Sequence, residues 1–164
     1  MFKIEQFKST PTLIVGLIIT SLIIIVIYLS LSAKNAEARI VLLPGDLSVT
    51  KLGKTVYMEN CASCHGAVLE GQANWQQRDS DGYMPAPPHD VSGHTWHHPS
   101  SYLFLMTKYG IEKMIGEKYP NNMPAYENEL TDNEIIAVLS YIKSTWPKPI
   151  QRQHDEISAY ANTQ

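Results

Sequence analysis

The first pattern along the chain is a long apolar run near its N-terminus. Residues 9–33 contain no charged residue, and residues 13–31 read LIVGLIITSLIIIVIYLSL. As a helix, these 19 residues would span about 28 Å, close to the roughly 30 Å hydrocarbon core of a bilayer. Lys8 and Lys34 bracket the run. We therefore expect residues 1–33 to form an N-terminal transmembrane anchor.

The same run is also compatible with a cleaved signal peptide. Residues 36–38, Ala-Glu-Ala, have the small-x-small form of a cleavage site. The apolar core of a signal peptide usually has about 7–15 residues, however, and this run is longer. Charge does not choose an orientation, because Lys3 and Lys8 precede the run while Lys34 and Arg39 follow it. The sequence favours an uncleaved anchor whose orientation depends on the chemistry of the rest of the chain.

After the run, polar and Pro-Gly residues over 34–47 predict a linker. Asp46 and Ser48 are both suitable N-cap residues for a first helix. That helix has one apolar face at the helical period, made of Val49, Leu52, Gly53, Val56 and Tyr57. The soluble domain is predicted to start at residue 48.

A long irregular loop is expected between residues 66 and 100. Its glycines and prolines include Gly71, Gly82, Pro85, Pro87, Pro88, Gly93 and Pro99. A loop of this length in a compact domain usually surrounds a ligand or carries a function. Residues 101–109 then predict a helix that stops at Gly110, and residues 111–115 predict a short one.

The last predicted helix has the clearest start. Thr131 and Glu134 have the spacing of a capping box, and Pro147 ends the pattern. Between them, apolar residues recur at helical spacing at Ile135, Val138, Leu139 and Ile142. Residues 149–164 are predicted to be a polar tail outside the domain. Because no alternating strand pattern is convincing, we expect an all-α domain over residues 48–148.

Composition and charge then exclude several classes of protein. With 44% hydrophobic residues, the chain is not wholly disordered. From Asp46 onward the net charge is −5, from 9 Lys and Arg against 14 Asp and Glu. There is no basic stripe, which argues against nucleic-acid binding. The two cysteines are too few for a disulfide scaffold, so we interpret them as a dedicated chemical site.

The two cysteines belong to the sequence Cys61-Ala62-Ser63-Cys64-His65, which has the C-x-x-C-H form of c-type haem attachment. Two thiols three positions apart can each add to one vinyl group of a haem, and His65 then supplies the proximal nitrogen to the iron. A thioredoxin-like redox pair would need a βαβ setting, which the sequence lacks. A zinc site would need histidines in place of a second cysteine pair. Haem attachment is the favoured interpretation.

Around this motif, residues 46–148 resemble the class I cytochrome c family. The matching pieces are Gly53-x-x-x-Tyr57 before C-x-x-C-H, the segment Met-Pro-Ala-Tyr at 123–126, and the run LTDNEIIAVLSYIKSTW. The resemblance implies an all-helical domain with one covalently bound haem c. It also implies that the first and last helices of the domain cross, with Gly53 against Tyr141.

In that family the distal iron ligand is a methionine in an M-P-A-F/Y segment, which maps onto Met123. Met84 is the main rival, because Met84-Pro85-Ala86 repeats the same triplet, but it lies only 19 positions after His65 against 58 for Met123. The other candidates are Met58, Met106, Met114, His89, His94, His97 and His98. The resemblance further implies a backbone carbonyl that accepts the other ring N–H of His65, which residues 85–88 can supply.

The histidine-rich loop over residues 89–98 is not part of a minimal cytochrome c. One interpretation is a second metal site, for copper or zinc, through His94, His97 and His98. Another is that one histidine is an alternative haem ligand. The simplest is that these rings pack at the haem edge or hydrogen-bond to its propionates.

Taken together, these features predict an electron carrier rather than an enzyme, free-standing or part of a larger oxidoreductase. We expect a monohaem domain held at the bacterial cytoplasmic membrane and facing the periplasm, where it serves a respiratory chain. Its expected partners are the membrane and redox proteins, namely a membrane oxidoreductase or oxidase and small soluble carriers, that dock on its acidic surface. No nucleic-acid partner is expected. Two alternatives stay open: a haem with a labile distal ligand that acts on peroxide or binds a small gas, and a copper-handling module.

Overall fold

The computed structural model describes residues 11–34 and 39–164, with side chains over 14–30 and 39–164. The chain divides into two units at the junction of residues 39 and 40. Lys3, Lys8 and the small-x-small sequence at 36–38 lie outside the described residues, so the predictions that rest on them stay predictions.

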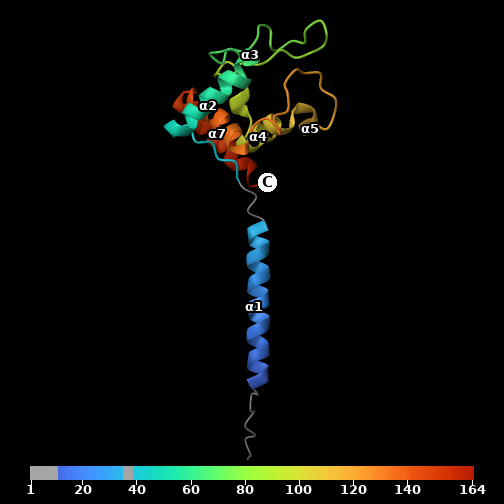
Figure 1. Cartoon of the computed structure of the whole chain (residues 1–164), viewed down its shortest axis with the longest axis vertical. Helices are drawn as coiled ribbons and strands as arrows, with labels where there is room; N and C mark the ends of the chain where they lie inside the picture. The colour runs from blue at the N-terminus through green and yellow to red at the C-terminus, as the bar shows by residue number, and fades with distance from the viewer. Residues whose placement is uncertain (1–10, 35–38) are drawn as a thin grey trace, which may run out of the picture. The chain divides into compact units, whose positions relative to one another are not determined.

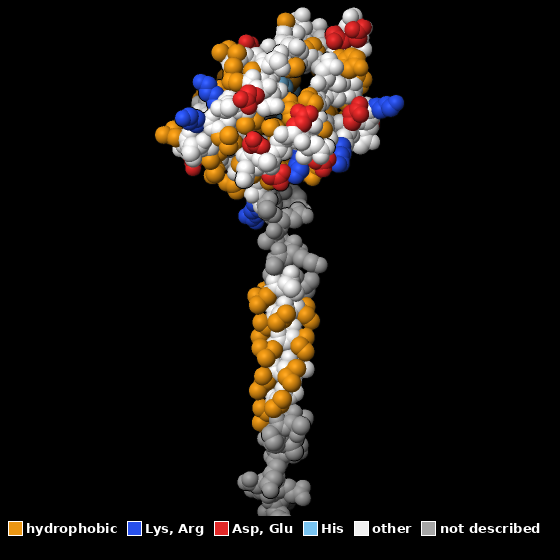
Figure 2. Space-filling view, in the orientation of Figure 1, with side chains coloured by type: hydrophobic (Ala, Val, Ile, Leu, Met, Phe, Trp, Pro, Cys, Tyr) orange, Lys and Arg blue, Asp and Glu red, His pale blue; other side chains and the backbone are white. Residues whose placement is uncertain are grey.

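The first unit contains one helix, α1 (Pro11–Lys34) (Figure 1). Its large apolar side chains from Ile14 to Leu29 are all exposed, which Figure 2 shows along the length of the helix. In the part of the chain that the structure describes, no helix combines the length and the apolar character needed to cross a membrane.

The second unit is built from helices joined by long loops. Its elements are α2 (Leu47–Asn60), α3 (Ala62–His65), the 3-10 turn η1 (Thr95–His97), α4 (Ser100–Tyr109), α5 (Ile111–Ile115), α6 (Asp132–Ser144) and α7 (Lys148–Ala161). No strand occurs within residues 39–164. The all-α prediction is confirmed for these residues.

The predicted helix ends follow from local hydrogen bonds. Asp46 is the N-cap of α2, and its side chain accepts from the backbone N–H groups of Ser48 and Val49. Thr131 and Glu134 form both halves of the predicted capping box of α6. Gly110 ends α4 at a φ of +83°, a conformation that glycine adopts without steric cost.

The core of the domain is the crossing of α2 and α6. Gly53 makes this crossing possible, since a Cβ built on it would lie 2.0 Å from the carbonyl oxygen of Ala137 and 2.9 Å from Cβ of Tyr141. The rings of Tyr57 and Tyr141 pack beside it, with centroids 5.6 Å apart. The contact of Gly53 with Tyr141 is therefore as the resemblance implied.

The linker before α2 was predicted to cover residues 34–47, and the structure makes it shorter. Leu42 is buried in the core, with Ile40 packed against it. The backbone N–H of Leu43 donates to the Ser140 hydroxyl of α6 at 2.9 Å. Residues 40–47 therefore belong to the domain, because the side chains of Ile40 and Leu42 pack into its core.

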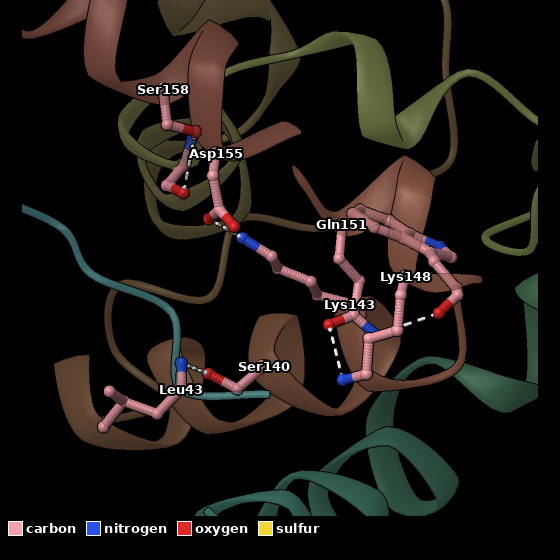
Figure 3. A network of polar contacts seen from close by, with 9 residues as sticks. Leu43, Ser140, Lys143, Lys148, Gln151, Asp155 and Ser158 are labelled. Carbon is pink, nitrogen blue, oxygen red and sulfur yellow. Dashed lines mark hydrogen bonds and ion pairs between the residues drawn. The ribbon is translucent and has the colours of Figure 1, made fainter. Parts of the chain in front are cut away.

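The segment after Pro147 corrects the prediction of a polar tail, since it forms α7 and packs on the domain. Gln151 and His154 are buried. Figure 3 shows Asp155 of α7 reaching Lys143 of α6, and Gln151 lying near Lys148. The backbone N–H of Ser100 donates to the Ser158 hydroxyl at 3.0 Å. Polar side chains and the apolar Ile150, which packs against the core, together hold this helix in place.

Candidate haem site

The C-x-x-C-H sequence occupies one tight turn at the end of α2. Cys61 is both the C-cap of α2 and the N-cap of α3. Its carbonyl oxygen accepts from the backbone N–H groups of Cys64 at 3.1 Å and of His65 at 2.9 Å. Gly66 ends the turn at a φ of +84°. The two sulfurs and the imidazole are thus carried by five consecutive residues in a fixed backbone.

The two thiols are free and differ in exposure. Cys61 is partly buried and Cys64 is exposed. Burial, followed by the neighbouring Cys64, raises the pKa of Cys61 to about 11. The Cys61 thiol is therefore protonated at neutral pH in the folded protein.

Two tyrosine hydroxyls hold the turn from outside. The Tyr57 hydroxyl donates to the Gly66 carbonyl at 2.8 Å, beyond the end of the motif. The Tyr126 hydroxyl donates to the Asn60 carbonyl at 2.8 Å, just before it. Burial raises the pKa of Tyr126 to about 12, so it remains a donor at neutral pH. Sequence reasoning missed both bonds, because periodicity identifies Tyr57 only as part of an apolar face.

The His65 ring is buried and fixed at one nitrogen. Its Nδ1 lies 2.8 Å from the carbonyl oxygen of Pro87. Because that oxygen can only accept, Nδ1 carries the proton and Nε2 keeps its lone pair for a metal. Pro87 lies in the 85–88 stretch that was predicted to supply this acceptor. Burial lowers the pKa of His65, which keeps the imidazole neutral.

Two glycines bring the Pro87 carbonyl to His65. A Cβ on Gly71 would lie 2.5 Å from the backbone nitrogen of Pro88, and a Cβ on Gly93 would lie 2.0 Å from the Pro88 carbonyl oxygen. The backbone N–H of Gly71 also donates to the His65 carbonyl at 2.8 Å. The loop over 66–100 is therefore packed against the motif at close backbone distances.

Met123 lies partly buried on a loop between α5 and α6. Its backbone N–H donates to the Asn121 side-chain oxygen at 3.0 Å. Met123 lines a cavity of about 280 Å³ with Tyr109, Gly110, Ile111, Glu112, Lys113, Asn121 and Ala125. The cysteines and His65 are not among the residues that line this cavity.

The histidine-rich loop does not assemble the second metal site considered above. Within residues 14–30 and 39–164, no group of three or more His, Cys, Asp and Glu side chains is arranged to hold a metal ion. The rings instead pack on aromatic neighbours. His98 stacks on Tyr102 with centroids 5.0 Å apart, and His94 lies 5.3 Å from Trp75.

These observations first define a class: an all-helical domain with a C-x-x-C-H turn at a helix end is a c-type haem protein. The family model described as Cytochrome c matches residues 50–146, more than half of the chain. The chain belongs to the cytochrome c family. A comparison with curated proteins and a comparison with solved structures each found no match.

Membership of this family sets the cofactor and the general chemistry. The cofactor is covalently bound haem c, and the general activity is haem-based electron transfer. The residues of the turn fit this group, because two free thiols lie beside an imidazole whose Nε2 is available.

Proposed function

We propose that this protein carries single electrons through one haem c attached at Cys61 and Cys64, with His65 as the proximal iron ligand. The observation that carries the proposal is the clamped, neutral imidazole of His65 beside two free thiols. When bound, the haem supplies an iron that changes between Fe(III) and Fe(II). The protein supplies the axial nitrogen and holds its buried imidazole through the Pro87 carbonyl.

We further propose Met123 as the distal ligand. Two hydrogen bonds of Tyr126, three positions after Met123, attach this loop to the rest of the domain. The backbone N–H of Tyr126 donates to the Thr107 carbonyl at 3.1 Å, and its hydroxyl donates to Asn60 at 2.8 Å. Met84 lies three positions before Pro87, in a segment whose backbone is committed to the contact with Nδ1 of His65. A thioether ligand raises the reduction potential and fills the sixth position.

The test is an optical spectrum of the purified haem-loaded protein, ferric and ferrous, with carbon monoxide then added to the ferrous form. We expect a Met-to-iron charge-transfer band in the ferric spectrum and no shift with carbon monoxide. Met123→Ala should lose the band and bind carbon monoxide, because it opens the sixth position.

Met84→Ala is the matched control and should keep the band. If Met84→Ala loses the band instead, the distal ligand is Met84. If the unaltered protein binds carbon monoxide promptly, the sixth position is open or labile, and a role with peroxide or a small gas replaces electron transfer.

We also propose that the uncharged run over residues 9–33 holds the domain at the bacterial cytoplasmic membrane with the haem on the periplasmic side, in a respiratory chain. Two observations support this. The described side chains of residues 14–30 are exposed and largely apolar, and the uncharged run in the sequence continues beyond them, from residue 9 to residue 33. Burial of such a surface in lipid removes it from water. The partners on the periplasmic side would be redox proteins with basic docking surfaces.

A further inference from the structure

One side chain at the site has no role in the attachment motif, namely His89. Its ring stacks on the ring of His65, with centroids 3.9 Å apart and an interplanar angle of 23°. Two imidazoles lie face to face at van der Waals distance, and one of them is the proposed iron ligand. The stacking was not foreseen from the sequence, where His89 is one of several histidines in a loop.

The position of His89 is fixed by hydrogen bonds on three sides. Its Nδ1 lies 2.8 Å from the Thr95 hydroxyl, and Thr95 is buried. Its backbone N–H donates to the Leu69 carbonyl at 2.8 Å, and its carbonyl accepts from Trp146 Nε1 at 2.8 Å. His89 is therefore a rigid surface against which another ring can be held.

The Pro87 hydrogen bond restrains the His65 ring but does not lock its plane. Rotation about the Cβ–Cγ bond moves Nδ1 away from the Pro87 carbonyl, but a hydrogen bond weakens steeply only when its angle falls below roughly 120°, so the ring can still rock within that range. A second ring packed on its face blocks that rotation, because any turn drives ring atoms into the stacked neighbour. Pro87 sets which nitrogen points outward, and His89 narrows the range of planes that the hydrogen bond still allows.

We propose that His89 is a positioning residue that fixes the plane of the His65 imidazole and thereby the electronic state of the haem iron. The inference rests on the proposed role of His65 as proximal ligand. The plane of an axial imidazole determines which iron d orbitals overlap with the ring, so a fixed plane gives one magnetic environment and one reduction potential.

The experiment compares three substitutions at or near this stack in the full haem-loaded protein. His89→Ala removes the stacked ring, His89→Phe keeps a planar ring, and Thr95→Val removes the hydroxyl that holds His89. The readout is the hyperfine-shifted haem methyl signals in the proton NMR spectrum of the ferric form, with the reduction potential measured on the same samples.

We expect His89→Ala to change the order or spread of the methyl shifts and to move the potential. His89→Phe should restore both toward the values of the unaltered protein, and Thr95→Val should give an intermediate change. His98→Ala is the matched control, because His98 stacks on Tyr102 rather than on His65.

The proposal is overturned if haem-loaded His89→Ala keeps the methyl pattern and the potential, or if His98→Ala changes them equally. If His89→Ala does not take up haem, Thr95→Val decides: a changed pattern supports the proposal and an unchanged one overturns it. Failure of the proposed function looks different, because the unaltered protein would then lack the spectrum of a histidine-ligated c-type haem.

Discussion

At the scale of single residues, the most unusual group outside the haem site is His154 on α7. It is fully buried, and neither ring nitrogen makes a hydrogen bond of ordinary geometry within the described residues. The Trp146 ring lies edge-on to it, with centroids 5.3 Å apart. Lys143 of α6, Asp155 of α7 and the backbone of His98 are the polar groups around it. The protein therefore contains a neutral imidazole in a place that disfavours its charged form.

This residue gives a prediction about stability and pH. Burial, followed by the charge of Lys143, lowers the pKa of His154 from 6.5 to about 4 in the folded protein. The unfolded chain takes up a proton near pH 6.5, whereas the folded chain does so only near pH 4. Above pH 6.5, His154 is neutral in both states and costs the folded protein nothing. As the pH falls toward 4, protonation of the unfolded chain lowers the free energy of unfolding by up to about 3 kcal/mol.

The measurement is the free energy of unfolding in denaturant at pH 7.5 and pH 5 for the haem-loaded protein. His154→Phe keeps an apolar ring beside Trp146 without a titrating group, so the loss of stability between these pH values should shrink. The same substitution at exposed His97 is the control. Equal pH dependence in the unaltered protein and in His154→Phe would contradict the prediction.

At the scale of the element, the crossing of α2 and α6 depends on the absence of a side chain at Gly53. An added Cβ would lie 2.0 Å from the Ala137 carbonyl oxygen, so Gly53→Ala must push the two helices apart. Overpacking of this kind costs typically about 1–3 kcal/mol, and occasionally more. We expect a loss of at least about 2 kcal/mol in the free energy of unfolding.

Gly45→Ala provides the comparison, because a Cβ there meets nothing within 4 Å. The measurement is the free energy of unfolding in denaturant for both variants in the haem-loaded state. A Gly53→Ala protein as stable as Gly45→Ala would mean that the helices do not approach as closely as described.

The elements also separate what sequence can predict from what it cannot. The ends of α2 and α6 were predictable because Asp46 and the Thr131–Glu134 box act through local hydrogen bonds. Helix α7 was not predicted because the residues after Pro147 are mostly polar. Its inner face places Ile150 and Ile157 at helical spacing beside buried Gln151 and His154, which is the signal that could have found it. The turn over 61–65 was predictable from spacing, whereas the stacking of His89 on His65 depends on how a long loop folds back.

At the scale of the whole molecule, anchoring and docking should respond differently to salt. The part from Asp46 onward has a net charge of −5, and Figure 2 shows acidic and basic side chains mixed over the visible face of the domain. We therefore expect the net charge, rather than one patch, to attract a basic partner. Salt screens this attraction, whereas burial of an apolar helix in lipid does not depend on charge.

The prediction is tested with the full haem-loaded chain mixed with vesicles of neutral lipid. The protein should float with the vesicles at low and at high salt, while electron exchange with a small soluble basic redox protein slows as salt rises. Recovery of the protein free of vesicles would contradict the anchor. An exchange rate that stays flat or increases with salt would contradict electrostatic docking.

The extended segment at residues 40–43 has a mechanical consequence. Leu42 is buried in the core and Leu43 is bonded to Ser140 of α6, so the chain is pinned before it enters α2. Any pull that arrives along the backbone from residue 39 is borne first by this segment and by α6. Helix α2, which leads to Cys61, comes after this attachment point in the chain, so the force reaches α2 only if the attachment breaks. Tension on the N-terminal end of the domain is thereby kept away from the turn that holds the cofactor.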